Sequence, residues 1–155
     1  MTQFFTQNSD IIFKLVIALV LGMFIGAERL LVHKEAGMKT HALVSMGAAL
    51  FIIISEILGK KYMGNGFNPA QMASNIIVGI GFLGAGAIIL QGSRLVGLTT
   101  AGGLWVTAGI GMAAGFGLFS LAIISTVLVL LIFITMNFFE KPIKRISGDI
   151  DQPQG

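Results

Sequence analysis

The chain has 155 residues, of which 55% are hydrophobic and only 11% are charged, whereas a soluble domain of this size carries about 25% charged residues. This balance excludes an ordinary water-soluble domain. Because the sequence contains no cysteine, it also excludes a disulfide framework, a thiolate nucleophile and a zinc–thiolate site. The net charge of +3 comes from basic residues scattered along the chain, so nucleic acid is not an expected partner.

Five apolar segments are long enough to cross a membrane as helices. The hydrocarbon core of a bilayer is about 30 Å thick and requires about 20 apolar helical residues, with about 17 as the lower limit. The sequence therefore predicts an all-α fold, a polytopic transmembrane bundle of five helices with the lipid bilayer as its first partner. The predicted segments are 11–32, 40–58, 69–91, 99–115 and 118–139.

Residues at the helix boundaries support this division. Asn68 precedes Pro69, which is the typical order of an N-cap and a first helical residue. Thr99 is expected to cap the fourth helix. Only residues 115–117 separate the fourth helix from the fifth, so these two helices should form an antiparallel hairpin.

Basic residues flank the two sides of the predicted bundle unequally. Lys60 and Lys61 lie on one side, and seven basic residues lie on the other. Because Lys and Arg are enriched on cytoplasmic sides, the N-terminus should be outside and the C-terminus cytoplasmic. Lys14 is expected to extend from the first helix toward the interface. The seven residues are Arg29, Lys34, Lys39, Arg94, Lys141, Lys144 and Arg145.

The domain division follows from the same segments. Residues 1–10 form an N-terminal tail, residues 11–139 a single transmembrane domain, and residues 140–155 a short basic cytoplasmic tail. A basic tail at the membrane surface gains about 1 kcal/mol per residue against anionic lipid, so we expect the tail to anchor the end of the chain.

Glu28 and Arg29 are charged residues inside the first apolar segment, near its cytoplasmic end. A charge at membrane depth costs on the order of 3 kcal/mol, so the pair should face the bundle interior. It forms either an interfacial ion pair or part of a hydrated cavity. Further polar residues fall at the same level. The predicted inner cluster consists of Glu28, Arg29, Lys39, Thr40, His41, Arg94, Thr99 and Thr100.

An outer polar cluster is expected where the second helix ends and the third begins, from Glu56, Gln71 and Asn75. Between Glu56 and Glu140 the sequence has no acidic residue. Since Mg²⁺ is usually anchored by one or two carboxylates, a carboxylate-lined pore is disfavoured unless Glu28 or Glu56 supplies it. Neither histidine has a second one four residues away. An interfacial role for His41 is therefore favoured over the alternative role of a metal ligand. No cofactor is expected.

Glycine recurs inside the apolar segments, and residues 79–86 contain a literal G-x-G-x-x-G. A dinucleotide site would require a preceding strand and a following acidic residue, and the sequence offers neither. In apolar helices such glycines let neighbouring backbones approach closely. This packing surface exceeds what five helices need, so we expect a homo-oligomer, most simply a dimer. The predicted packing glycines are Gly22, Gly26, Gly79, Gly81, Gly84, Gly86, Gly103, Gly111 and Gly115.

Five motifs follow one another at residues 26–29, 36–45, 79–86, 97–105 and 113–118. In sequence and order they resemble those of the MgtC/SapB family of bacterial inner-membrane proteins. The resemblance implies a five-helix inner-membrane protein, in a short form without the cytoplasmic domain of the longer members. It also implies a link to magnesium limitation and, in pathogens, to virulence; the Mg²⁺ link rests on this resemblance alone. Lys39 and Gly102 stand where the family commonly has arginine and alanine.

The sequence is compatible with three classes of function. The leading hypothesis is a non-enzymatic membrane protein of magnesium-limitation adaptation, acting by helix-mediated association with itself or a membrane partner. The alternative is a small ion or solute transporter or channel with its site at the cytoplasmic ends of helices one, two and four. No catalytic residues are assigned, because no catalytic constellation is recognisable; an enzyme would require a hydrated cavity joining Glu28, His41 and Thr100.

Overall fold

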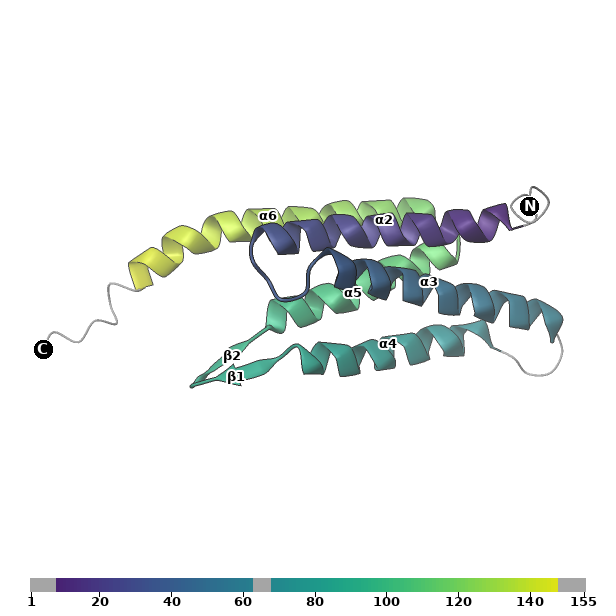
Figure 1. Cartoon of the computed structure of the whole chain (residues 1–155), viewed down its shortest axis with the longest axis horizontal. Coiled ribbons are helices and arrows are strands. Elements are labelled where there is room, and N and C mark those ends of the chain that lie inside the picture. Colours follow the sequence, from purple (N-terminus) through teal and green to yellow (C-terminus); the bar gives the residue numbers. More distant parts are fainter. Residues whose placement is uncertain (1–7, 63–67, 148–155) are drawn as a thin grey trace, which may run out of the picture.

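The computed structural model describes residues 8–62 and 68–147, within which five helices alternate in direction (Figure 1). The all-helical prediction is confirmed, apart from one short β-hairpin. We call the end of the bundle where α2 and α4 finish the hairpin end. The elements are α2 (Ser9–Leu31), α3 (Met38–Lys61), α4 (Pro69–Gly86), β1 (Ile89–Gln91), β2 (Arg94–Val96), α5 (Leu98–Gly115) and α6 (Phe119–Ser147).

The prediction that the third helix runs to residue 91 is wrong. Helix α4 ends at Gly86, and the chain then forms an antiparallel hairpin in which Leu90 pairs with Leu95. Gly92, at the first position of the two-residue turn, has a φ of 63°, which glycine adopts without steric cost. A short apolar run does not by itself distinguish a helix end from a strand.

Two other boundaries also differ from expectation. Thr99 does not cap α5, because the N-cap is Gly97, with a φ of 92° and no side-chain capping bond. A Cβ at Gly97 would collide with the carbonyl oxygen of Ala87, so the chain requires glycine there. Helix α6 continues beyond Phe139 to Ser147. The Asn68 cap is confirmed, since its Oδ1 accepts a 2.9 Å hydrogen bond from the Ala70 amide.

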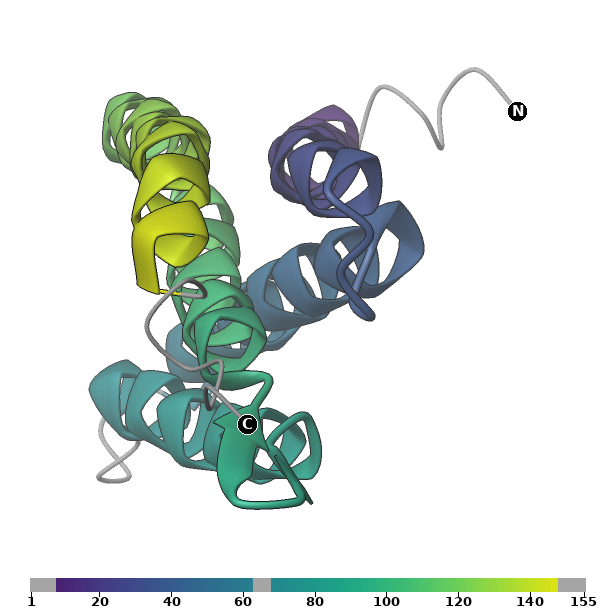
Figure 2. The same cartoon turned by 90° about the vertical axis from the view of Figure 1, so that its left-hand side faces the viewer.

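Helix α5 is the centre of the bundle. It packs against α2, α3, α4 and α6, whereas α4 packs against α3 and α5. Viewed end-on, α5 lies between α6 on one side and α4 on the other (Figure 2). Buried Ile25, Ala49 and Ile110 form part of the core where α2, α3 and α5 meet.

The outer surface of the bundle is apolar. Leu31, Phe82 and Phe138 are 78%, 81% and 74% exposed, an arrangement typical of lipid-facing side chains and unfavourable in water. By length and composition, three helices in the described residues are able to cross a membrane: α2, α3 and the part of α6 that ends at Phe139. The chain is therefore a helical membrane protein.

Candidate functional site

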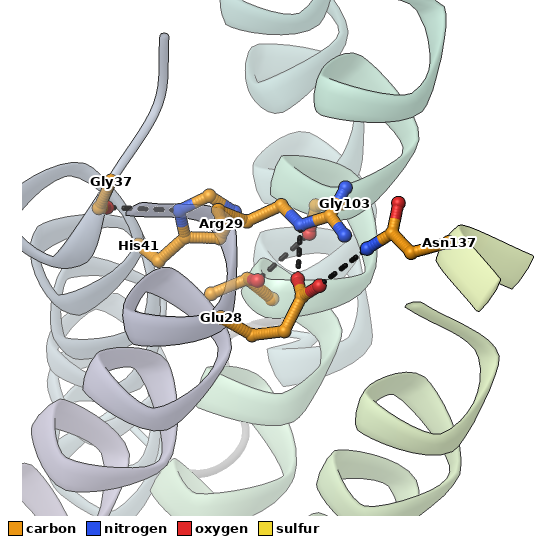
Figure 3. Close-up of polar contacts among 7 residues, drawn as sticks. Glu28, Arg29, Gly37, His41, Gly103 and Asn137 are labelled. Carbon is orange, nitrogen blue, oxygen red and sulfur yellow. Dashed lines mark hydrogen bonds and ion pairs between the residues drawn. The ribbon is translucent and has the colours of Figure 1, made fainter. Parts of the chain in front are cut away.

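The charged pair at the end of α2 is inside the protein. Arg29 is 1% exposed and Glu28 is 9% exposed, so both of these adjacent residues are buried. The Nε of Arg29 donates to Oε2 of Glu28 at 2.5 Å (Figure 3). The two charges therefore neutralise each other, as the ion-pair alternative required.

Helix α6 completes the surroundings of this pair. Asn137 donates from Nδ2 to Oε1 of Glu28 at 2.8 Å, and the ring centroid of Phe133 lies 3.6 Å from Cζ of Arg29. Both oxygens of the carboxylate are thus occupied, and the guanidinium gains a cation–π contact. Phe133 and Asn137 are one helical turn apart, so they share one face of α6.

His41 lies beside the pair, at the first turns of α3. It is fully buried, and its Nδ1 is 3.0 Å from the carbonyl oxygen of Gly37 (Figure 3). Because a carbonyl only accepts, Nδ1 carries the proton in this contact. Its Nε2 has no hydrogen-bond partner among the described residues.

Gly103 of α5 provides the space in which these side chains meet. A Cβ there would lie 3.2 Å from Cζ of Phe133 and 3.6 Å from Nε2 of His41. The carbonyl oxygen of Gly103 accepts a 2.7 Å hydrogen bond from the Thr107 hydroxyl. We call Glu28, Arg29, His41, Phe133 and Asn137 the buried polar cluster; it is contributed by α2, α3 and α6 around one position of α5.

The other members of the predicted inner cluster lie outside this group. Lys39, Thr40, Arg94 and Thr99 are exposed, and Thr100 is buried. Thr40 and Thr100 line a different cavity of about 450 Å³, together with Glu35 and Phe82. The structure thus divides the predicted cluster into three parts: Glu28, Arg29 and His41 lie in the buried polar cluster, Thr40 and Thr100 line the separate cavity, and the remaining three residues are exposed.

The predicted outer cluster is arranged differently from expectation. Nζ of Lys14 donates to Oε2 of Glu56 at 3.2 Å and lies 3.5 Å from Oδ2 of Asp10. The side chain of Lys14 is only 12% exposed, whereas its partners Asp10 and Glu56 are 75% and 28% exposed. Gln71 and Asn75 are exposed on α4, and Glu56 forms no hydrogen bond with either in the described residues.

Eight of the nine predicted packing glycines fall into two groups. In the first group a Cβ would press on a neighbouring helix: at Gly22, for example, it would lie 2.8 Å from Cβ of Ser45, and at Gly115 2.9 Å from the carbonyl oxygen of Ala49. In the second group a Cβ would meet nothing within 4 Å in the described structure. The first group is Gly22, Gly26, Gly103, Gly111 and Gly115, Gly84 makes an ordinary contact, and the second group is Gly79, Gly81 and Gly86.

The residues that sequence reasoning missed are Phe133 and Asn137. The available signal was an amide in an otherwise apolar segment, four residues after an aromatic side chain, but nothing in the sequence links it to Glu28. In the described ranges, no group of three His, Asp or Glu side chains lies close enough together to bind a metal ion.

Most of this chain is similar in sequence to known proteins. The "Putative magnesium transporter YhiD" of Escherichia coli K12 is 40% identical over 131 residues, which is 81% of this chain and 60% of that protein. "Protein MgtC" of Salmonella typhimurium LT2 is 43% identical over 119 residues, covering 77% and 49%. "Protein MgtC" of Brucella abortus is 40% identical over 129 residues, covering 83% and 50%. The chain therefore spans between 49% and 60% of the length of these relatives.

No solved structure gives a significant match. The model of the MgtC family matches residues 15–142, a range that contains the buried polar cluster and every glycine of both groups. This match and the identity with relatives named MgtC and YhiD agree with the resemblance drawn from the motifs. The chain belongs to the MgtC family.

Proposed function

We propose that this chain is a non-enzymatic, multi-pass protein of the bacterial inner membrane that serves adaptation to magnesium limitation. It acts by pairing helix α4 with a helix of a second copy or of another membrane protein. The relatives named for magnesium support the physiological setting. The open glycines of α4 support the mode of action.

The observation that carries this proposal is the contrast between the two groups of glycines. Glycine in a helix costs about 0.5–1 kcal/mol relative to alanine. At Gly111 the absence of a side chain lets α5 lie against the Ser45 backbone of α3. At Gly79 and Gly86 no such neighbour exists in the described chain, so a helix from outside it would give these glycines the same packing role.

The surface beside these glycines has the shape for such a partner. A groove of about 500 Å³ lies between α3 and α4, and Gly47 and Gly79 form parts of its two walls. Asn75 also lines it; the residue is exposed, and its side-chain amide forms no hydrogen bond with the described residues. An amide facing lipid lacks a partner, whereas two copies related by a twofold axis satisfy each other's Asn75.

The membrane arrangement belongs to the same proposal. All five helices cross the bilayer, since each reverses the direction of the one before it (Figure 1). The hairpin end faces the cytoplasm, because Lys34, Lys39 and Arg94 are exposed there, in agreement with the enrichment of basic residues on that side. The side chains of Lys141, Lys144 and Arg145, and residues 1–7 and 148–155 of the tails, lie outside the described part of the structure.

The proposal is tested by energy transfer between donor-labelled and acceptor-labelled copies reconstituted in lipid vesicles. G79L combined with G86L places leucines at two positions where a Cβ meets nothing within 4 Å in the described chain, so transfer should fall to the level of randomly mixed proteins. G81L is the matched control, because Gly81 is equally open but lies about 200° around α4 from Gly79. Equal transfer in the unchanged protein, the double variant and G81L, with no other membrane protein captured through α4, would contradict the proposal.

A transporter is the second candidate, supported by the name of the E. coli relative and by the cavity of about 450 Å³ at the hairpin end. Its lining includes Glu35, Thr40 and Thr100 and none of Glu28, Arg29 and His41. Transport through this cavity predicts Mg²⁺ or solute flux into vesicles that T100V reduces strongly. Flux no greater than in empty vesicles would eliminate this candidate.

A further inference from the structure

The β-hairpin carries an apolar base and a polar tip. At its base Ile89, Leu90 and Leu95 are 61%, 66% and 59% exposed, and Leu90 pairs with Leu95 across the two strands. At its tip Gln91 pairs with Arg94, and the turn between them is Gly92 and Ser93. The polarity of the hairpin therefore changes along its length, from the helices toward the tip.

Water is a poor environment for this element. A two-stranded hairpin is at best marginally stable alone in water, and this one exposes apolar side chains on both faces, since Ile89 and Leu90 are adjacent and point to opposite sides. The hairpin projects beyond the ends of α4 and α5 (Figure 1), so the bundle does not cover it. A further apolar medium is needed to stabilise it.

The dimensions place the hairpin at the boundary of the bilayer. Helix α4 has 18 residues and is about 27 Å long, slightly less than the hydrocarbon thickness of about 30 Å. Strands of three residues add about 10 Å. The base of the hairpin thus reaches the edge of the hydrocarbon, and its tip reaches the headgroups. Deeper insertion is unfavourable, because the outer edges of the two strands leave backbone groups that need polar partners.

The charges of the hairpin end fit the headgroups of anionic lipids. Arg94 at the tip is exposed, as are Lys34 of the connection between α2 and α3 and Lys39 in the first turn of α3. A guanidinium binds a phosphate through two parallel hydrogen bonds. We infer that the hairpin is an interfacial anchor, with Leu90 and Leu95 inserted among acyl chains and Arg94 bound to the phosphate of an anionic phospholipid in the same leaflet.

The absence of cysteine from the sequence allows each part of this anchor to be tested with single-cysteine variants of the full chain. L90C and S93C are labelled with an environment-sensitive fluorophore in nanodiscs that contain phosphatidylglycerol and phosphatidylcholine. We expect brominated acyl chains to quench the probe at L90C several-fold more than the probe at S93C. A water-soluble maleimide should react at least about tenfold faster with S93C than with L90C.

Two results would overturn the anchor. Equal maleimide reactivity of L90C and S93C would show that the hairpin stands in water. Protection of L90C without quenching by brominated lipid would show that a protein strand covers the hairpin, as in strand addition by a second copy. Helix content measured for both variants verifies that the bundle has folded.

The contact with anionic lipid is tested separately through Arg94. In S93C, spin-labelled phosphatidylglycerol should quench the probe more than spin-labelled phosphatidylcholine, and the added variant R94Q should abolish this preference. K60Q is the matched control, because Lys60 is an exposed basic residue at the opposite end of the bundle. Equal quenching by the two lipids before the Arg94 change, or an equal loss of preference in K60Q, would overturn the assignment of Arg94.

Discussion

Helices α5 and α4 are both rich in glycine, but the structure uses two glycines of α5 and two of α4 in opposite ways. On α5, Gly111 and Gly115 are positions where α3 approaches so closely that no side chain fits. On α4, Gly79 and Gly86 face open space in the described chain. Polar groups follow the same division: Arg29 and Glu28 are paired in the core, whereas the Asn75 side chain of α4 has no hydrogen-bond partner among the described residues. The comparison suggests that α2, α3, α5 and α6 hold the fold together, while α4 presents a surface to a partner.

The largest expected effect on stability comes from opening the buried polar cluster. R29M removes the cation and leaves the Glu28 carboxylate buried with Asn137 as its remaining partner. Breaking a buried pair from one side costs about 3–5 kcal/mol, and this loss should appear in the free energy of unfolding measured in mixed micelles. K39M, at an exposed position of the same end, should change little. A loss below about 1 kcal/mol in R29M would show that the buried ion pair contributes little to stability, and would weaken the contrast between the core and α4.

A smaller but clear loss is expected from G111A. The new Cβ would collide with the carbonyl oxygen of Ser45, and forcing a side chain into a packed core costs about 1–3 kcal/mol. G109A is the control on the same helix, because a Cβ at Gly109 meets nothing within 4 Å. Equal unfolding free energies for the two variants would contradict the close packing of α3 against α5.

The same change on α4 should act in the opposite direction. G79A places a Cβ in open space, so it should stabilise the isolated chain by about 0.5–1 kcal/mol through the better helix propensity of alanine. Its self-association in vesicles should weaken at the same time. A destabilised monomer would indicate that α4 is packed like α5 and would remove the contrast.

The smallest effect is expected at the end of the bundle opposite the hairpin. E56Q weakens the pair with Lys14, in which the Glu56 side chain is 28% exposed. Exposed and partly exposed ion pairs contribute about 0–1 kcal/mol, so unfolding should change by less than about 1 kcal/mol, with a modest dependence on salt. A loss as large as that of R29M would mean that this pair belongs to the core that holds the fold.

The sequence predicted the helices because apolar length is a strong local signal. It also identified the Asn68 cap and the short turn between α5 and α6, which depend on neighbouring residues. It did not predict the hairpin at 89–96, because a run such as Ile89 to Gln91 is too short for its periodicity to separate strand from helix. The presence of Asn137 beside Glu28 was out of reach, since the two are 109 positions apart and only tertiary packing joins them.

The glycines show the same limit more sharply. The sequence marked Gly79 and Gly111 as packing positions, but it offered no means to tell which glycine meets a helix of its own chain. That distinction depends on where α3 lies relative to α4 and α5, which is a property of the folded bundle. The expectation of an oligomer stays a prediction, now assigned to the open glycines of α4. Gly22 and Gly26 of α2 and Gly111 and Gly115 of α5 already pack against neighbouring segments of the same chain.

Cross-linking through α4 in native membranes tests the central claim most directly. F82C places a single thiol at a residue that is 81% exposed on α4, and L128C places one at a residue that is 54% exposed on α6. Under mild oxidation or with a short bifunctional maleimide, we predict a cross-linked dimer or a discrete adduct for F82C and far less product for L128C. Equal, low cross-linking of both variants in intact membranes would contradict the role of α4 as a docking surface.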